Sequence, residues 1–422
     1  MSVQSIGAPD EPQEALAPAR GFLTFQPMQS KLRAWWSERQ GLDGSLEGAS
    51  PADVLERSGW SRSVGGVGPY LTLFSRAGTS RAAADKAVAD LEICELPAAR
   101  GCTYVLPASD FALGLLAGRE MSGGDLKSAK KLGVTDHEID ALGVAVRKAL
   151  SKGPLAPDAI REAVGPAARS LGEAGKKKGV TTTLPLALGQ LQTAGEIRRV
   201  PVNGRLDQQR YQYALWKPNP LGKSKLSREA AYTELARRYF RWVGPATPAE
   251  FQWFSGLGVK TAQAATEPLG LVPGEPGSDR LLLPEDAAAF RKFKPTTKPH
   301  YVLVSSLDSI SAHRRNVVTL LDPADLDRQV VAERGLAAVS SFADLPSHAI
   351  LDRGRVVGFW EYDADAEEIV STTFGIKDKG LDAAIERMET FVRDQLGDAR
   401  SFSLDSPKSR APKIKALRAL RR

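Results

Sequence analysis

This chain contains closely spaced basic side chains. Their type and spacing suit the binding of phosphate. Three consecutive lysines precede an arginine pair and one further arginine in the middle of the sequence. Ammonium and guanidinium groups are the side chains that neutralise phosphate oxygens. Each residue taken alone is equally compatible with a solvated basic loop. The candidate phosphate contacts are Lys176, Lys177, Lys178, Arg198, Arg199 and Arg210.

The elements that would position these residues are three helices and a β-hairpin. Apolar residues recur at helical spacing, and Asn203-Gly204 between two strand-like segments is a strong hairpin signal. The third helix would turn Thr183, Ala187 and Gln190 outward. Three helices and a two-stranded wing form the winged-helix pattern, in which the third helix enters the major groove of DNA and the wing contacts the backbone. The predicted segments are helices at 138–150, 158–164 and 184–191 and strands at 196–202 and 210–216.

Gly-Pro punctuation indicates that this unit is one of three related units. Pro51, Pro157 and Pro248 each open a predicted helix, about 90–110 residues apart, which is the size of a small domain. In the clearest copy, Thr247 is predicted to cap a helix and Glu250 to complete a capping box. The first copy is predicted to have a helix capped by Ser50, a glycine-rich linker at 59–70 and a hairpin at 94–106. Gly-Pro pairs that mark ordinary helix starts are the alternative explanation. We favour tandem units, because each copy lies between a long amphipathic helix and a later strand pair.

After Phe293 the pattern changes to short strands, including one at 356–362, followed by one amphipathic helix. The fold class is therefore predicted to be α+β, with tandem winged-helix domains followed by a β-rich C-terminal domain. The predicted boundaries are a disordered leader at 1–20, winged helices at 21–120, 125–217 and 226–294, a β-rich domain at 297–405 and a basic tail at 406–422. The tail carries seven basic residues and no acidic one, while the formal net charge of the whole chain is +7. It is predicted to grip a polyanion, or alternatively to aid solubility as a disordered segment.

Several classes of protein are excluded by composition. The two cysteines, Cys94 and Cys102, form no disulfide framework, and the four histidines lack metal-ligand spacing, so we expect neither a metal nor another cofactor. No apolar run approaches the ~18 residues that span a bilayer, and the first residues lack the apolar core of a signal peptide. We therefore expect a cytoplasmic, nucleoid-associated monomer with no membrane contact. High Ala, Gly and Arg content is typical of a GC-rich bacterial genome.

The chain resembles the bacterial winged-helix DNA-binding family that includes the AlkZ and YcaQ DNA glycosylases. The resemblance implies three tandem winged helices and a C-terminal β-rich domain around a C-shaped cleft that binds double-stranded DNA. It also implies hydrolytic removal of alkylated purines, including the unhooking of interstrand crosslinks. Four stretches carry it, namely GPYLTLFSRAG at 68–78, ARGCTYVLPASDFALGLL at 99–116, LARRYFRWVGPATPAEFQWFSGL at 235–257 and HAILDRGRVVGFWEY at 348–362.

The sequence departs from this family at the catalytic motif. Family members carry Gln-x-Gln or Gln-x-Asp ahead of a Pro-Tyr-x-x-Leu stretch, and the corresponding residues here are Ser61, Arg62 and Ser63. Cleavage of an N-glycosidic bond needs a polar group that positions water at C1′. A serine can orient water without being a strong base, and an arginine cannot act as a base. Asp43 or Glu47 is a candidate for a relocated carboxylate.

Three functions are compatible with these observations. The first is a duplex-DNA-binding protein that recognises or repairs damage, with Arg62 and Arg100 contacting DNA in the cleft beside the six basic residues named above. The second is an active alkylpurine DNA glycosylase in which Ser61, Arg62 and Ser63 replace the family motif. The third is a winged-helix transcriptional regulator, because a fold does not by itself fix a function.

Overall fold

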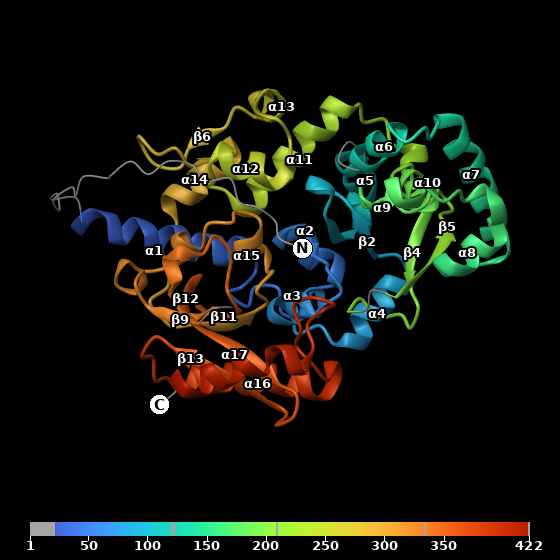
Figure 1. The fold of residues 1–422 in the computed structure, drawn as a ribbon. Helices are drawn as coiled ribbons and strands as arrows, with labels where there is room; N and C mark the ends of the chain where they lie inside the picture. Colours follow the sequence, from blue (N-terminus) through green and yellow to red (C-terminus); the bar gives the residue numbers. More distant parts are fainter. Residues whose placement is uncertain (1–21, 120–122, 208–209, 333–334, 421–422) are drawn as a thin grey trace, which may run out of the picture.

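The computed structural model describes residues 22–119, 123–207, 210–332 and 335–420. The leader predicted at 1–20 lies outside these residues. Helices and antiparallel strands are mixed along the chain, which is the α+β composition predicted from the sequence. Figure 1 shows α5–α10 with β4 and β5 on one side of the molecule, and the orange-to-red C-terminal elements at the lower left.

The first part of the chain places a small sheet among helices. Ser50 caps α2 as predicted, by accepting a hydrogen bond from the backbone N–H of Asp53. The glycine-rich stretch 59–70, predicted as a linker, instead contains β1 and the start of α3. β1 pairs with β3 across more than forty residues of chain, with Ser61 opposite Val105, so local sequence does not reveal it. The elements are α1 (Phe22–Arg39), α2 (Pro51–Ser58), β1 (Ser61–Arg62), α3 (Gly68–Ala77), α4 (Arg81–Ala89), β2 (Ile93–Pro97), β3 (Thr103–Pro107) and α5 (Phe111–Arg119).

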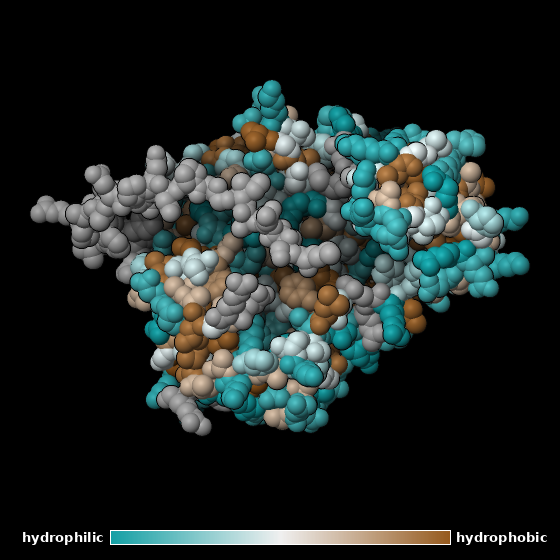
Figure 2. Space-filling view, viewed as in Figure 1, coloured by the Kyte–Doolittle hydropathy of each residue, from teal (hydrophilic) through white to brown (hydrophobic). Residues whose placement is uncertain are grey.

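The second part forms a lobe with a hydrophobic core of its own, built from buried residues between Ala129 and Tyr213. The predicted hairpin is confirmed as β4 paired with β5. The prediction that Thr183 and Ala187 face outward is wrong, since both are buried where α10 packs against α7 and α5. The visible surface of the lobe is largely hydrophilic (Figure 2). Its elements are α6 (Gly123–Lys130), α7 (Asp136–Ala149), α8 (Pro157–Val164), α9 (Gly172–Lys176), α10 (Leu184–Thr193), β4 (Ile197–Pro201) and β5 (Tyr211–Leu215).

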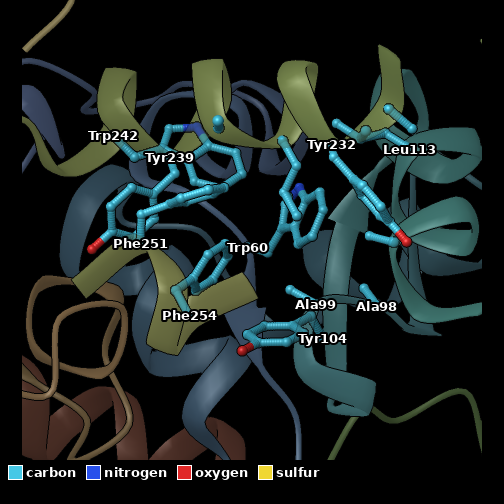
Figure 3. Close-up of a cluster of buried hydrophobic side chains, with 14 of the residues drawn as sticks. Trp60, Ala98, Ala99, Tyr104, Leu113, Tyr232, Tyr239, Trp242, Phe251 and Phe254 are labelled. Carbon is cyan, nitrogen blue, oxygen red and sulfur yellow. The ribbon is translucent and has the colours of Figure 1, made fainter. Parts of the chain in front are cut away.

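The third part shares its core with the first part. The capping box of Thr247 and Glu250 is present as predicted. Figure 3 shows Trp60, which directly precedes β1, among aromatic side chains of α11 and α12, and its ring centroid lies 5.4 Å from that of Trp242. The units predicted at 21–120 and 226–294 therefore share one hydrophobic core. The elements are α11 (Arg228–Val243), α12 (Pro248–Ser255), α13 (Val259–Thr266), β6 (Val272–Pro273), β7 (Leu281–Leu282) and α14 (Pro284–Lys292).

The C-terminal part contains an antiparallel sheet of order β13-β12-β11-β8. The predicted strand at 356–362 is confirmed as β12, and all but the two terminal residues of that strand are buried. One hydrophobic cluster joins this sheet to α3 and α4, so the first and last parts also share a core. The elements are β8 (Tyr301–Val304), α15 (Ser309–Ala312), β9 (Gln329–Ala332), β10 (Gly335–Ala338), β11 (His348–Asp352), β12 (Arg355–Asp363), β13 (Glu368–Thr373), α16 (Lys379–Phe391) and α17 (Pro407–Leu420).

Of the two predictions for the basic tail, a disordered segment is wrong for the described residues up to Leu420. Residues 407–420 form α17, which packs on β9, β12 and β13. Its basic residues pair with acids of the C-terminal part, including Lys413 with Glu361 at 2.7 Å. Three of the seven basic residues seen in the sequence, Arg410, Lys413 and Arg418, thus form ion pairs that hold α17 on the C-terminal part.

Substituting alanine for Leu417 is expected to lower the free energy of unfolding by about 2 kcal/mol. Leu417 is 1% exposed and packs in a small cluster with Val370 of β13, so its removal leaves a cavity under α17. Chemical denaturation of the full chain measures this loss. Leu420→Ala is the matched control, because Leu420 is 40% exposed on the same helix. An equal loss in the two variants would contradict a docked α17.

Candidate nucleic-acid interface and catalytic strand

The sheet of order β1-β3-β2 places the predicted catalytic residues on two faces. Successive side chains of a strand point to opposite faces, so Ser61 and Ser63 share one face and Arg62 lies on the other. Arg62 pairs in register with Tyr104 of β3. The three residues are thus neighbours in the chain but have different surroundings.

On the first face, Glu95 of β2 links two predicted site residues. Ser63 Oγ donates a hydrogen bond to Glu95 Oε2 at 2.7 Å, and Arg199 Nη1 lies 3.4 Å from Glu95 Oε1. Ser61 is buried and its hydroxyl contacts Thr72 Oγ1 at 3.2 Å. The structure therefore brings Ser63 of the first part and Arg199 of the second lobe together around a carboxylate.

Neither acid considered for a relocated carboxylate contacts this segment. The carboxylate of Asp43 accepts a hydrogen bond from Ser45, within the same exposed turn. Glu47 pairs with Arg387 of α16 at 3.2 Å. Asp43 and Glu47, considered above for a relocated carboxylate, therefore have other partners in the described residues.

The loop after β1 is fixed against the C-terminal part. The backbone N–H of Val67 donates to the carbonyl of Arg400 at 2.9 Å, and that of Ser403 donates to the carbonyl of Val64 at 3.2 Å. A Cβ atom at Gly66 would lie 2.1 Å from the carbonyl oxygen of Ser401, so only glycine allows this approach. The glycine-rich sequence therefore serves to hold the end of β1 in place.

On the second face, Arg62 lies against an aromatic core. Its guanidinium carbon is 5.4 Å from the ring centroid of Tyr104, and its Nη1 atom is buried without a hydrogen-bond partner among the described residues. Burial raises the pKa of the Tyr104 hydroxyl, while Arg62 and Arg100 act in the opposite direction. Both arginines predicted for the cleft thus lie near one phenol.

The tip of the β2–β3 hairpin carries an exposed cation beside an aromatic ring. Arg100 adopts a positive φ of 58°, and its guanidinium lies 4.0 Å from the ring centroid of Trp253 on α12. Arg315 approaches the same ring at 5.6 Å. A tryptophan with two guanidinium groups nearby suits both cation–π contact and phosphate binding.

The remaining predicted contacts lie in the second lobe. The three lysines at 176–178 are exposed, and Lys176 pairs with Glu173 at 2.7 Å. Arg210 is exposed at the start of the second hairpin strand. Arg198 is partly buried near Cys94, whose thiol pKa is raised by burial to about 12 although Arg198 acts to lower it. Cys94 is consequently protonated at neutral pH.

Glu95 is the site residue that the sequence interpretation missed. It lies 32 residues from Ser63 in the chain, and only the pairing of three strands brings the two together. The available signal was an acidic residue between Cys94 and Leu96 in a predicted strand, because both neighbours are buried. An acid on the opposite face of such a strand needs a polar partner.

Membrane-spanning helices and metal-ligand clusters are both absent from the residues that the structure describes. There, no helix combines the length and apolar character needed to cross a bilayer. No cluster of three or more His, Cys, Asp or Glu side chains in the same ranges is arranged to hold a metal ion.

Comparison with known proteins identifies a family and similar solved structures. The model of the family described as DNA glycosylase AlkZ-like matches residues 67–391, a range that begins just after β1. The structure of the Streptomyces sahachiroi DNA glycosylase AlkZ aligns with a TM-score of 0.65 at 21% sequence identity, covering 88% of this chain and 97% of that chain. At this identity the likeness establishes a common fold. No curated protein matches the chain.

Proposed function

Because this chain belongs to the AlkZ-like DNA glycosylase family, we propose that it binds double-stranded DNA and acts in the recognition or repair of damaged bases. The observation that carries the proposal is the exposed Arg100, which lies over Trp253 with Arg315 nearby. Guanidinium groups position a protein on the phosphate backbone, and an indole offers a surface on which a base can stack. The exposed lysines at 176–178 supply a second cationic surface.

Replacing Lys176, Lys177 and Lys178 with alanine in one variant is expected to weaken duplex binding by a similar factor for every DNA sequence. Each lost phosphate contact should lower the slope of log K against log salt by about 0.9. Fluorescence anisotropy of a labelled duplex over a series of salt concentrations measures both quantities. Arg100→Ala, measured in the same way, tests the hairpin tip separately.

The matched control replaces Lys292, Lys294 and Lys298 with alanine. These lysines are exposed, and their replacement removes the same amount of charge. An equal fall in slope in both triple variants would mean that the lysines at 176–178 act only through net charge. A preference of the unaltered protein for one operator by about 10³ over random DNA would instead favour a transcriptional regulator.

Hydrolysis of the N-glycosidic bond is a second candidate function. One observation favours it. Ser63, at the position of the family motif, donates a hydrogen bond to the carboxylate of Glu95 on β2. Release of 7-methylguanine from duplex DNA under single-turnover conditions tests this activity directly. Release above background that is lost in Arg62→Ala/Ser63→Ala would show that the activity depends on the segment that includes β1.

A further inference from the structure

The carboxylate of Glu95 has the surroundings of a group that handles water. We propose that Glu95 holds and deprotonates the water that cleaves the N-glycosidic bond of a damaged base, with Ser63 as a positioning residue. This inference rests on the duplex binding and the N-glycosidic hydrolysis proposed above. It assigns the chemistry to β2 rather than to the strand where the family carries its motif.

The orientation of Glu95 is fixed from two parts of the molecule. Ser63 of the first part donates to Oε2 at 2.7 Å, and Arg199 of the second lobe lies 3.4 Å from Oε1. A carboxylate has about four acceptor positions, so one contact on each oxygen leaves the others available. The Glu95 side chain is 19% exposed, which leaves it within reach of water.

Arg199 is itself held for this contact. Its guanidinium lies 4.3 Å from the ring centroid of Tyr211, and its Nε atom is buried with no hydrogen-bond partner in the described ranges. A cation with this restricted freedom loses little conformational entropy when it orients a carboxylate. The ion pair joins β2 to β4, so the arrangement exists only when the second lobe is docked.

Among the residues that the structure describes, Glu95 is the acid hydrogen-bonded to residues 61–63, whereas Asp43 and Glu47 have partners elsewhere. Ser63 lacks the basicity to deprotonate water by itself. A serine that donates to a neighbouring carboxylate keeps its own lone pairs free to accept a hydrogen bond from the same water.

The proposed step balances for a cationic N7-alkylated purine. The oxygen of water forms a bond to C1′ while the bond from C1′ to N9 breaks, and the electron pair of that bond passes to N9. The positive charge of the base is thereby cancelled, and the base leaves as a neutral molecule. Glu95 accepts the proton released from water, so that the products are the free base, an abasic sugar with a hydroxyl at C1′ and the protonated carboxyl.

Glu95→Gln tests the assignment, because it removes the carboxylate that would deprotonate water while retaining the size of the side chain. The assay places excess full-length protein on a duplex that contains one 7-methylguanine and follows base release in a single turnover. We expect a rate at least about 10²-fold below that of the unaltered protein, with duplex affinity and thermal unfolding unchanged.

Two controls separate catalysis from the ion pair. Glu92→Gln is the matched substitution at an exposed position just before β2, and it should leave the rate unchanged. Arg199→Gln breaks the same ion pair but keeps the carboxylate, so a merely structural tether predicts equal losses in Glu95→Gln and Arg199→Gln. A much larger loss of rate in Glu95→Gln, measured at saturating protein, supports the role as base.

The remaining outcomes distinguish this inference from the proposed function. Base release that persists in Glu95→Gln, or duplex binding by the unaltered protein without any base release, would overturn the role of Glu95 and leave DNA binding intact. Failure of the unaltered protein to bind duplex DNA would overturn both.

Discussion

Replacing Arg76 with alanine is expected to lower the free energy of unfolding by about 3–5 kcal/mol, because it leaves a buried carboxylate without its counter-charge. Two guanidinium nitrogens of Arg76 on α3 each donate to an oxygen of Asp308 at 2.8 Å, and both side chains are 0% exposed. Arg76 Nε also donates to the carbonyl of Gln40 at 2.8 Å. The pair thereby joins the first part of the chain to the C-terminal part.

Arg76 also lowers the pKa of Asp308. Burial acts to raise its pKa, but the Arg76 guanidinium, together with the backbone N–H of Ile310, holds the pKa below its usual range. Without Arg76, the backbone N–H of Ile310 still favours the carboxylate, but the guanidinium no longer offsets burial, and the charged form becomes costly. Chemical denaturation at neutral pH measures the loss, and the apolar double variant Arg76→Met/Asp308→Leu should be more stable than Arg76→Ala.

The control for Arg76→Ala is an exposed ion pair between the same two parts. Arg387 and Glu47 are 55% and 61% exposed, so Arg387→Ala should cost less than about 1 kcal/mol. Comparable losses in Arg76→Ala and Arg387→Ala would show that the buried pair does not connect the two parts as described.

Stability is expected to fall by about 3 kcal/mol through His313 alone as pH decreases from 6.5 to about 4. Burial lowers the pKa of His313 from 6.5 to about 4, while its hydrogen bond to the carbonyl of Trp60, at 2.9 Å, acts in the opposite direction. In this pH range the unfolded chain binds a proton that the folded protein excludes. The contribution is therefore complete above pH 6.5 and is lost as pH falls through the folded pKa.

Denaturation of the unaltered protein and of His313→Gln across this pH range measures the effect. The variant should show a weaker dependence of stability on pH, although part of it should persist because burial also lowers the pKa of His348. His137→Gln, at an exposed position of α7, is the control and should keep the full dependence. Identical pH dependence in His313→Gln and the unaltered protein would contradict a neutral, buried His313.

Several local features of this protein were determined by the sequence alone. The capping box of Thr247 and Glu250 and the cap at Ser50 formed as predicted, because each depends on residues at most three positions apart. Gly204 takes the positive φ of 76° that a tight hairpin turn requires, as its neighbour Asn203 indicated. The resemblance that rested on four stretches of sequence is matched by the family model over 67–391.

Tertiary structure decided the features that depend on distant partners. The sequence showed seven basic residues near the end of the chain, but not that Lys413 would find Glu361 on a sheet. It showed no acid within 59–70, but not that strand pairing would bring Glu95 to Ser63. Local propensity fixes where an element starts and stops, whereas the surroundings of a charge depend on which surfaces are buried together.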